Sequence, residues 1–210
     1  MKKFSNRYMI LYSLALVAVA SIVLSVTAVA LKPRQEKNKV AEQQQMVLKS
    51  IGVEASRSEA GELYGKYIAE RAVGSGQQAA NGNSYYTYNI DGREGIILPL
   101  HGAGLWGPIW GYIALDEERY IIGAVFDHKG ETPGLGGEIA SAKFAEQFVG
   151  KRVVDDKGSV KPIKLKKNAD KKSLYEVDAI SGGTMTSNGV SEMLEKDLNS
   201  FEEIVKTKKI

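Results

Sequence analysis

The longest apolar stretch of the chain lies near its start. Met9 to Leu31 contains no charged side chain, and at a rise of about 1.5 Å per residue a helix of this length crosses a hydrocarbon core of about 30 Å. A cleaved secretory signal is the alternative, because residues 1–7 are basic and Ala28–Ala30 reads small-x-small. The apolar region of such a signal usually has only about 7–15 residues. The pattern therefore favours an uncleaved transmembrane helix over residues 9–31.

The pattern on either side of this span sets the domain organisation. Residues 1–8 are a short tail, residues 32–50 have the composition of a helical stalk, and residues 51–210 form one domain. Basic residues lie on both sides of the span, so charge alone assigns no orientation. The short leading tail predicts a cytoplasmic N-terminus and a domain on the opposite side of the membrane.

The domain begins with a helical pattern and continues with strands. Residues 51–73 predict a helix that includes Leu63, Tyr67 and Ile68, and residues 74–84, rich in Gly, Asn, Ser and Gln, predict an exposed loop. Strand patterns follow at Tyr85–Ile90, Gly95–Leu100, Trp110–Leu115 and Tyr120–His128.

The remainder of the chain mixes helical and strand patterns. Ile139–Gly150 is spaced as a helix, short strands are predicted within residues 151–154, 161–166 and 175–180, and a final amphipathic helix runs from Val190 to Val205. Runs of antiparallel strands with helices at the ends indicate an α+β fold.

Composition removes several kinds of site. The 210 residues include no cysteine, which excludes disulfides, cysteine-ligated zinc, iron–sulfur clusters and a lipidated N-terminal cysteine. Only His101 and His128 are histidines, so a histidine-rich metal site is not indicated. The formal net charge is +3 and the charges are interleaved, so nucleic-acid binding has no support. The Lys-rich stretch Lys161–Lys172 is best explained as a solvated hairpin or loop.

Three glycine-containing stretches carry the candidate chemistry. They are GAGLWGPIWG at Gly102–Gly111, HKGETPGLGGE at His128–Glu138 and DAISGGTMTSNGV at Asp178–Val190. Their glycines permit tight turns and a close approach of backbone to a ligand. Each stretch also has a purely structural explanation: a bend around a core tryptophan, a long hairpin turn, or a generously capped helix start.

The third stretch favours binding of an anion. Gly182 and Gly183 allow consecutive N–H groups to converge, and the helix that follows adds the positive end of its dipole. Hydroxyl groups that can donate to a phosphate, or be esterified by one, belong to Ser181, Thr184, Thr186 and Ser187.

A planar cofactor that carries a phosphate would account for all three stretches together. Its phosphate would lie at the glycine pair, and its ring would lie against Leu105, Trp106 or Leu135. The sequence GLGGE does not open a helix of a βαβ unit, and no P-loop motif occurs, so the usual nucleotide-binding folds are not indicated.

These three motifs, in this order and after a single N-terminal span, resemble the C subunit of the Na⁺-translocating NADH:quinone oxidoreductases (NqrC), a family with a covalent FMN-binding domain. The resemblance covers roughly residues 96–190. In that family the FMN phosphate is esterified to a threonine within S-G-A-T-x-T, which implies attachment at Thr184, with Thr186 as the fallback. Gly183 stands where the family usually has alanine, which implies a looser loop before the attachment residue.

The resemblance also implies roles for other residues. Those implied to contact the flavin or its phosphate are Leu105, Trp106, Glu131, Thr132, Leu135, Lys166, Ser181, Gly182, Gly183 and Thr186. Lys164 and Lys167 compete with Lys166 for the lysine contact. Asp178 occupies the leading acidic position of the motif that a magnesium-requiring flavin transferase reads. His128 is better explained as a turn histidine than as a flavin ligand.

The implied function is that of an electron-carrier subunit with no catalytic acid or base of its own. The expected partners are the other subunits of the NADH:quinone reductase, a flavin transferase during maturation, and membrane lipid. Two alternatives remain. One is the G subunit of the related Rnf ferredoxin:NAD electron-transport complex, which also carries covalent FMN. The other is a membrane-anchored binding module without flavin.

Overall fold

The N-terminal part of the chain is a single long helix. A computed structural model describes residues 5–71 and 84–206, so residues 1–4 of the predicted tail and nearly all of the predicted loop 74–84 lie outside the described residues. Helix α1, Asn6–Ser50, contains both the predicted span and the predicted stalk, with Pro33 inside it. Among the described residues it is the one helix long and apolar enough to cross a membrane.

The chain divides into two compact units, Met1–Glu42 and Gln43–Ile210. The last two turns of α1 therefore belong with the domain, where Val47 and Leu48 are fully buried. These two apolar side chains pack in a core cluster with strand residues of the sheet.

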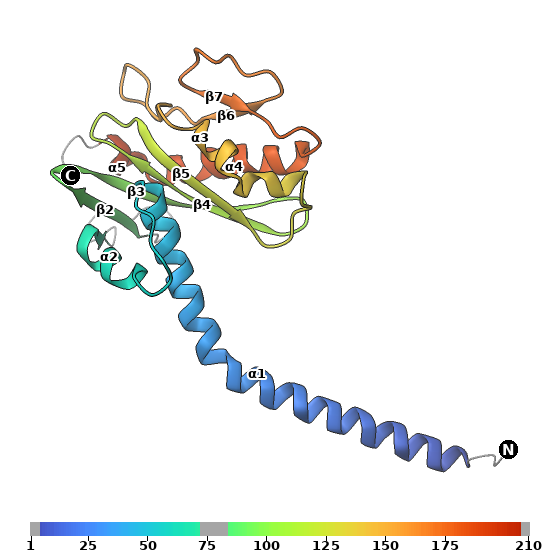
Figure 1. Cartoon of the computed structure of the whole chain (residues 1–210). Coiled ribbons are helices and arrows are strands. Elements are labelled where there is room, and N and C mark those ends of the chain that lie inside the picture. Colours follow the sequence, from blue (N-terminus) through green and yellow to red (C-terminus); the bar gives the residue numbers. More distant parts are fainter. Residues whose placement is uncertain (1–4, 72–83, 207–210) are drawn as a thin grey trace. The chain divides into compact units, whose positions relative to one another are not determined.

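The domain is built on a five-stranded antiparallel sheet in the order β1-β2-β3-β4-β5 (Figure 1). Its strands are β1 Ile68–Arg71, β2 Tyr85–Ile90, β3 Arg93–Ala103, β4 Pro108–Leu115 and β5 Ile121–His128. The four predicted strands are confirmed as β2 to β5. The predicted helix over 51–73 is confirmed only at Ala60–Tyr67, which is α2. Residues 51–59 form turns and irregular chain, and Ile68 pairs with Tyr88 in the sheet.

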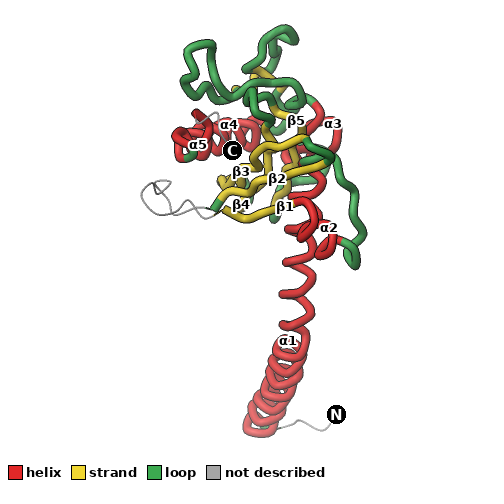
Figure 2. The backbone as a smooth tube through the Cα atoms, turned by 90° about the vertical axis from the view of Figure 1, so that its left-hand side faces the viewer, coloured by secondary structure: helices red, strands yellow, loops and turns green. Residues whose placement is uncertain are grey.

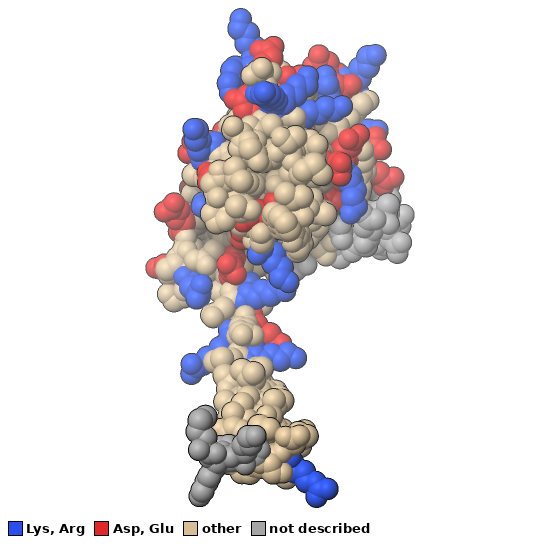
Figure 3. All heavy atoms as spheres, turned by 90° about the vertical axis from the view of Figure 1, so that its right-hand side faces the viewer, with Lys and Arg blue, Asp and Glu red and all other residues tan. Residues whose placement is uncertain are grey.

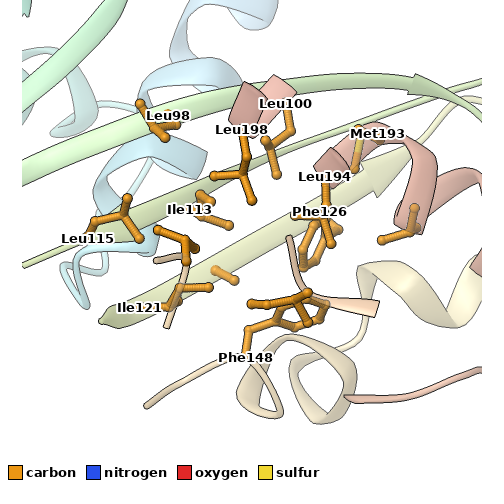
Figure 4. Packing of buried hydrophobic residues seen from close by; sticks show 14 of the residues in the cluster. Leu98, Leu100, Ile113, Leu115, Ile121, Phe126, Phe148, Met193, Leu194 and Leu198 are labelled. Carbon is orange, nitrogen blue, oxygen red and sulfur yellow. The ribbon is translucent and has the colours of Figure 1, made fainter. Parts of the chain in front are cut away.

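Helices cover both faces of this sheet (Figures 1 and 2). One face packs against the end of α1 and against α2, and the other against the helices that follow β5. On that second face, residues of β3 and β4 meet Leu194 and Leu198 of α4 (Figure 4). Because side chains alternate along a strand, the two faces of β3 and β4 supply two separate cores.

The helices after β5 differ from their predicted extents. Residues 139–150 do not form one helix: η1 covers Gly136–Ala140 and α3 covers Ala142–Glu146. The break lies at Ser141, whose hydroxyl accepts a hydrogen bond from the Phe144 N–H and so caps a new helix. The final helical pattern begins earlier than expected, with α4 at Thr184–Ser200, and α5 covers Glu202–Lys206.

A small second sheet holds the Lys-rich stretch. Strands β6, Lys164–Lys166, and β7, Glu176–Asp178, pair in parallel. Of the two predicted forms of the Lys-rich stretch, the hairpin is therefore wrong, and residues 167–172 form a loop after β6. The predicted strand at 151–154 reduces to isolated bridges, Tyr120 with Arg152 and Val154 with Val160. Parallel pairing is possible because residues 167–175, between the two strands, return the chain to the side of the sheet where β6 begins. Strand β7 then leads directly into the turn before α4.

Candidate functional site

The three glycine-containing stretches meet at one end of the sheet, on the right in Figure 1. The first forms the turn between β3 and β4, closed by a 2.8 Å hydrogen bond from the Gly104 N–H to the Gly107 carbonyl. The second begins at the end of β5 and leads into η1. The third is the turn that precedes α4. Antiparallel pairing of β3 with β4 and of β4 with β5 brings the first two together, and packing of α4 on the sheet adds the third.

Glu131 joins the three segments. It is 4% exposed, and its Oε1 accepts a 2.8 Å hydrogen bond from the Trp106 N–H while its Oε2 accepts a 2.5 Å hydrogen bond from the Thr186 hydroxyl. Its own N–H donates to His128 Nδ1 at 3.1 Å. Burial opposes ionisation, but these hydrogen bonds and the nearby His128 outweigh it and hold the pKa of Glu131 below its ordinary 4.5.

Two glycines make room for this carboxylate. A Cβ atom on Gly104 would lie 2.5 Å from Glu131 Oε1, and one on Gly136 would lie 2.5 Å from Oε2. Real Cβ contacts are longer than this, so any side chain at either position would displace the carboxylate or the loop. The glycines predicted to permit close backbone approach therefore enclose a protein side chain at these two positions.

The hydroxyl groups of the third stretch fall into two sets. Thr186 and Ser187 are each 2% exposed; the first donates to Glu131, and the second accepts a 3.0 Å hydrogen bond from the Ile180 N–H. Ser181 and Thr184 are exposed. Thr184 is the first residue of α4, so its hydroxyl lies at the positive end of the helix.

In the turn before α4, one of the two glycine amides that were predicted to bind an anion forms a hydrogen bond within the turn. The Gly183 N–H donates to the Ile180 carbonyl at 3.0 Å, and Gly182 has φ +73°, which glycine adopts without strain. The first intrahelical bond is from the Ser187 N–H to the Gly183 carbonyl at 2.8 Å. The amides of residues 184–186 precede it and have no acceptor within the helix. These three amides are therefore available to an acceptor outside the helix, whereas the Gly183 N–H is already used within the turn.

Exposed apolar side chains surround the start of α4. Leu105 is 52% exposed, Trp106 69%, Leu135 44% and Met185 60%. Leu135 approaches the turn closely, since a Cβ on Gly182 would lie 2.7 Å from its Cδ2. Viewed from this end, the domain shows a broad face with few charged side chains (Figure 3). Met185 is not among the predicted site residues; its signal in the sequence is its position between two threonines at a helix start.

The remaining predicted residues lie near this cluster or on the small sheet. Thr132 is exposed, and its carbonyl accepts the N–H groups of Leu135 and Gly137 at 3.1 and 3.0 Å, which shapes the loop. Lys166, on β6, pairs with Glu176 at 2.6 Å, so its described ion pair lies within the small sheet. Asp178, at the end of β7, pairs with Lys171 and accepts a 3.1 Å hydrogen bond from the Ala169 N–H; these contacts hold the pKa of Asp178 below its ordinary value.

This set of groups fits FMN. The start of α4 combines backbone amides that have no helical acceptor with the exposed Thr184 hydroxyl, which suits a phosphate. Exposed Leu105, Trp106 and Leu135 offer apolar and aromatic surface to a flat ring.

Comparison with known proteins agrees with this assignment. The family model of the FMN-binding domain matches residues 104–199. The C subunit of the Na⁺-translocating NADH-quinone reductase of Vibrio parahaemolyticus is 30% identical, over 82% of this chain and 82% of its own. That of Neisseria meningitidis serogroup B is also 30% identical, over 84% of this chain and 83% of its own.

Solved structures give the same result. The crystal structure of the C subunit from Parabacteroides distasonis has a TM-score of 0.74 and 36% identity, and it covers 85% of this chain and 98% of its own. NqrC from Shewanella oneidensis, at 24% identity, shares the fold with a TM-score of 0.66, over 82% of this chain and 99% of its own.

Proposed function

The chain belongs to the NqrC family, the C subunits of the Na⁺-translocating NADH-quinone reductases, and on this basis we propose that it carries FMN as a phosphoester of Thr184. It is one subunit of a multisubunit oxidoreductase, and its FMN-binding domain makes it an electron-carrier flavoprotein. The proposal rests on which hydroxyl groups are exposed and which are buried. Thr184 is exposed at the start of α4, whereas Thr186 and Ser187 are buried and hydrogen-bonded.

When bound, FMN supplies the chemistry of accepting and donating electrons. The residues of this chain bind and orient it. The amides at the start of α4 would hold the phosphate, and Leu105, Trp106 and Leu135 would contact the ring. A covalent bond prevents loss of the cofactor from a domain outside the cytoplasm.

Attachment requires an outside enzyme. Esterification joins Thr184 Oγ1 to phosphorus, releases the hydroxyl proton and expels an existing substituent of that phosphorus, so the donor must be a phosphoanhydride of FMN. A threonine hydroxyl is a weak nucleophile without a neighbouring base, and the buried carboxylate of this site, Glu131, is occupied by Thr186. We assign the base to a flavin transferase that reads the motif from Asp178 onward, and Lys166 to a flavin contact.

The membrane segment anchors the subunit. One apolar N-terminal helix and membership of a membrane-complex family fit a single-pass protein of the bacterial inner membrane. We place the domain on the periplasmic side, with the other subunits of the reductase and membrane lipid as partners. The relatives carry the name of the quinone reductase, which favours this complex over the Rnf complex, and the FMN-binding family match favours a flavoprotein over a binding module without flavin.

Intact mass after co-expression with a flavin transferase tests the attachment. We expect one FMN ester on the wild-type chain and none on Thr184→Ala, whereas Thr184→Ser, which keeps a hydroxyl at the same position, should still be esterified. Peptide mapping should place the adduct on Thr184. An adduct that persists in Thr184→Ala, or a wild-type chain that gains no mass, contradicts the proposal.

A further inference from the structure

We propose that Glu131 is a positioning residue of the FMN site and that its buried charge lowers the reduction potential of FMN there. The inference rests on the proposed function, because it concerns the same site. It differs from the expectation that Glu131 simply contacts the flavin, because the side chain is 4% exposed and both of its oxygens are occupied by protein donors.

The positioning role follows from which segments the carboxylate connects. Trp106 lies 25 residues before Glu131, on the turn that carries exposed Leu105 and the exposed indole. Thr186 lies 55 residues after it, about half a turn of helix beyond Thr184. One side chain therefore hydrogen-bonds both the turn that carries Leu105 and Trp106 and the first turn of α4, which carries the Thr184 hydroxyl.

The charge follows from the donors around the carboxylate. An N–H and a hydroxyl point at its oxygens, and the backbone of Gly104 and Gly136 closes against them. Its described contacts include no ion pair with a lysine or an arginine. The first turn of α4 has no acidic residue of its own, so Glu131 supplies negative charge to that helix end from another segment.

Because the Glu131 side chain is 4% exposed, water screens its charge less than it screens a charge in solvent. Reduction adds negative charge to bound FMN, so the carboxylate makes reduction less favourable. Trp106 and Thr186 hold the charge in place, and the chain has no side chain at residues 104 and 136 that would move it. The fixed position of the carboxylate thus determines how strongly its charge lowers the reduction potential of FMN.

Three substitutions separate geometry from charge. Glu131→Gln removes the charge and keeps the size of the side chain. Thr186→Val removes the hydroxyl and keeps the charge. Glu138→Gln, on η1, removes an exposed charge from the same loop and is the matched control.

The first measurement is the reduction potential of the FMN-loaded protein. We expect the equilibrium constant for reduction to rise about tenfold in Glu131→Gln, which is about 59 mV for a one-electron couple. Thr186→Val should change it by less than about threefold, which is under about 30 mV on the same scale, and Glu138→Gln should leave it unchanged. Equal potentials in Glu131→Gln and Glu138→Gln, with FMN bound in both, would overturn the charge role while the proposed function stands.

The second measurement is hydrogen exchange of the same full-length proteins without FMN. Amide exchange in residues 104–107 should be about tenfold faster in Glu131→Gln than in Glu138→Gln, because a hydrogen bond to a charged acceptor is stronger than one to a neutral acceptor. Exchange in β4 and β5 should be the same in both. Equal exchange at 104–107 overturns the positioning role, and this arm decides it even where no FMN ester forms and the proposed function fails.

Discussion

Two buried carboxylates lie near opposite ends of α4, and their environments differ. Glu131 reaches the first turn of the helix and accepts hydrogen bonds from Trp106 and Thr186. Asp197, near the other end, is 2% exposed and accepts one hydrogen bond of 2.6 Å, from the His101 N–H on β3. The pKa of Glu131 is lowered, whereas burial raises the pKa of Asp197 above its ordinary 3.8.

The difference shows what a buried charge needs. Both carboxylates lose water, but only Glu131 regains enough donors to remain favourably ionised. Asp197 accepts a single hydrogen bond, from an N–H of β3. This bond does not compensate for burial, so the ionised form of Asp197 destabilises the fold. At the end of α4 that meets the glycine loops, the surrounding donors therefore stabilise a buried carboxylate in its charged form. At the other end they do not.

Removal of the Glu131 or the Asp197 side chain should give the largest changes in the free energy of unfolding, and Glu131 should matter more. Glu131→Ala leaves a part-buried N–H and a buried hydroxyl without their charged acceptor, and we expect a loss of about 3 kcal/mol in the free energy of unfolding. Asp197→Ala should lose about 1 kcal/mol, since one hydrogen bond is removed along with an unfavourable charge. Urea denaturation measures both. An Asp197→Ala loss equal to or greater than that of Glu131→Ala would contradict this ranking.

Packing at the site end of α4 can be tested without changing any charge. A Cβ on Gly183 would lie 2.9 Å from Ile180 Cγ2 and 3.3 Å from the Gly136 N atom, so Gly183→Ala should destabilise the fold by about 2 kcal/mol through overpacking. In an Ile180→Ala background, which removes Cγ2, we expect the loss to fall by about 1 kcal/mol. A double-mutant cycle in urea measures the coupling, and additive losses would show that Ile180 is not the obstacle.

The pH dependence of stability should have opposite signs for the two carboxylates. Because the pKa of Glu131 is lowered in the fold, its contribution is present above its ordinary 4.5 and is lost as the pH falls through the folded value. Because the pKa of Asp197 is raised, its contribution is present below its ordinary 3.8 and is lost as the pH rises through the folded value.

The matching variants are Glu131→Gln and Asp197→Asn, compared with wild type from about pH 3 to about pH 7. With rising pH, Glu131→Gln should become less stable relative to wild type and Asp197→Asn more stable. The changes should be smaller than those caused by removal of either side chain. Parallel slopes for the two variants would argue against opposite shifts.

The smallest effect is expected on the small sheet, where charges are exposed. Lys166 and Glu176 form a 2.6 Å ion pair whose side chains are 51% and 22% exposed. Lys166→Ala should lower the free energy of unfolding of the protein without FMN by about 0.5 kcal/mol, because solvent screens such pairs. A loss above that of Asp197→Ala would show that surface pairing matters more here than burial.

Parts of the fold could be predicted because their signals are local. The patterns that predicted β2 to β5 lie within each strand, and the order of the three motifs led to the FMN-binding family. Ile68 was misassigned because its helical spacing is local, whereas its pairing with Tyr88 depends on a strand that follows later in the chain. The parallel pairing of β6 with β7 has the same cause.

The sequence alone was enough to predict the apolar span, the α+β class, the family and the threonine-rich helix start, since each rests on composition or on short patterns. The folded domain adds that Thr186 and Ser187 are consumed by internal hydrogen bonds while Thr184 remains exposed. It also places Glu131 inside the cluster and not on its surface. No local pattern could reveal this, because burial and hydrogen-bond partners belong to segments that meet only when the sheet and α4 have packed together.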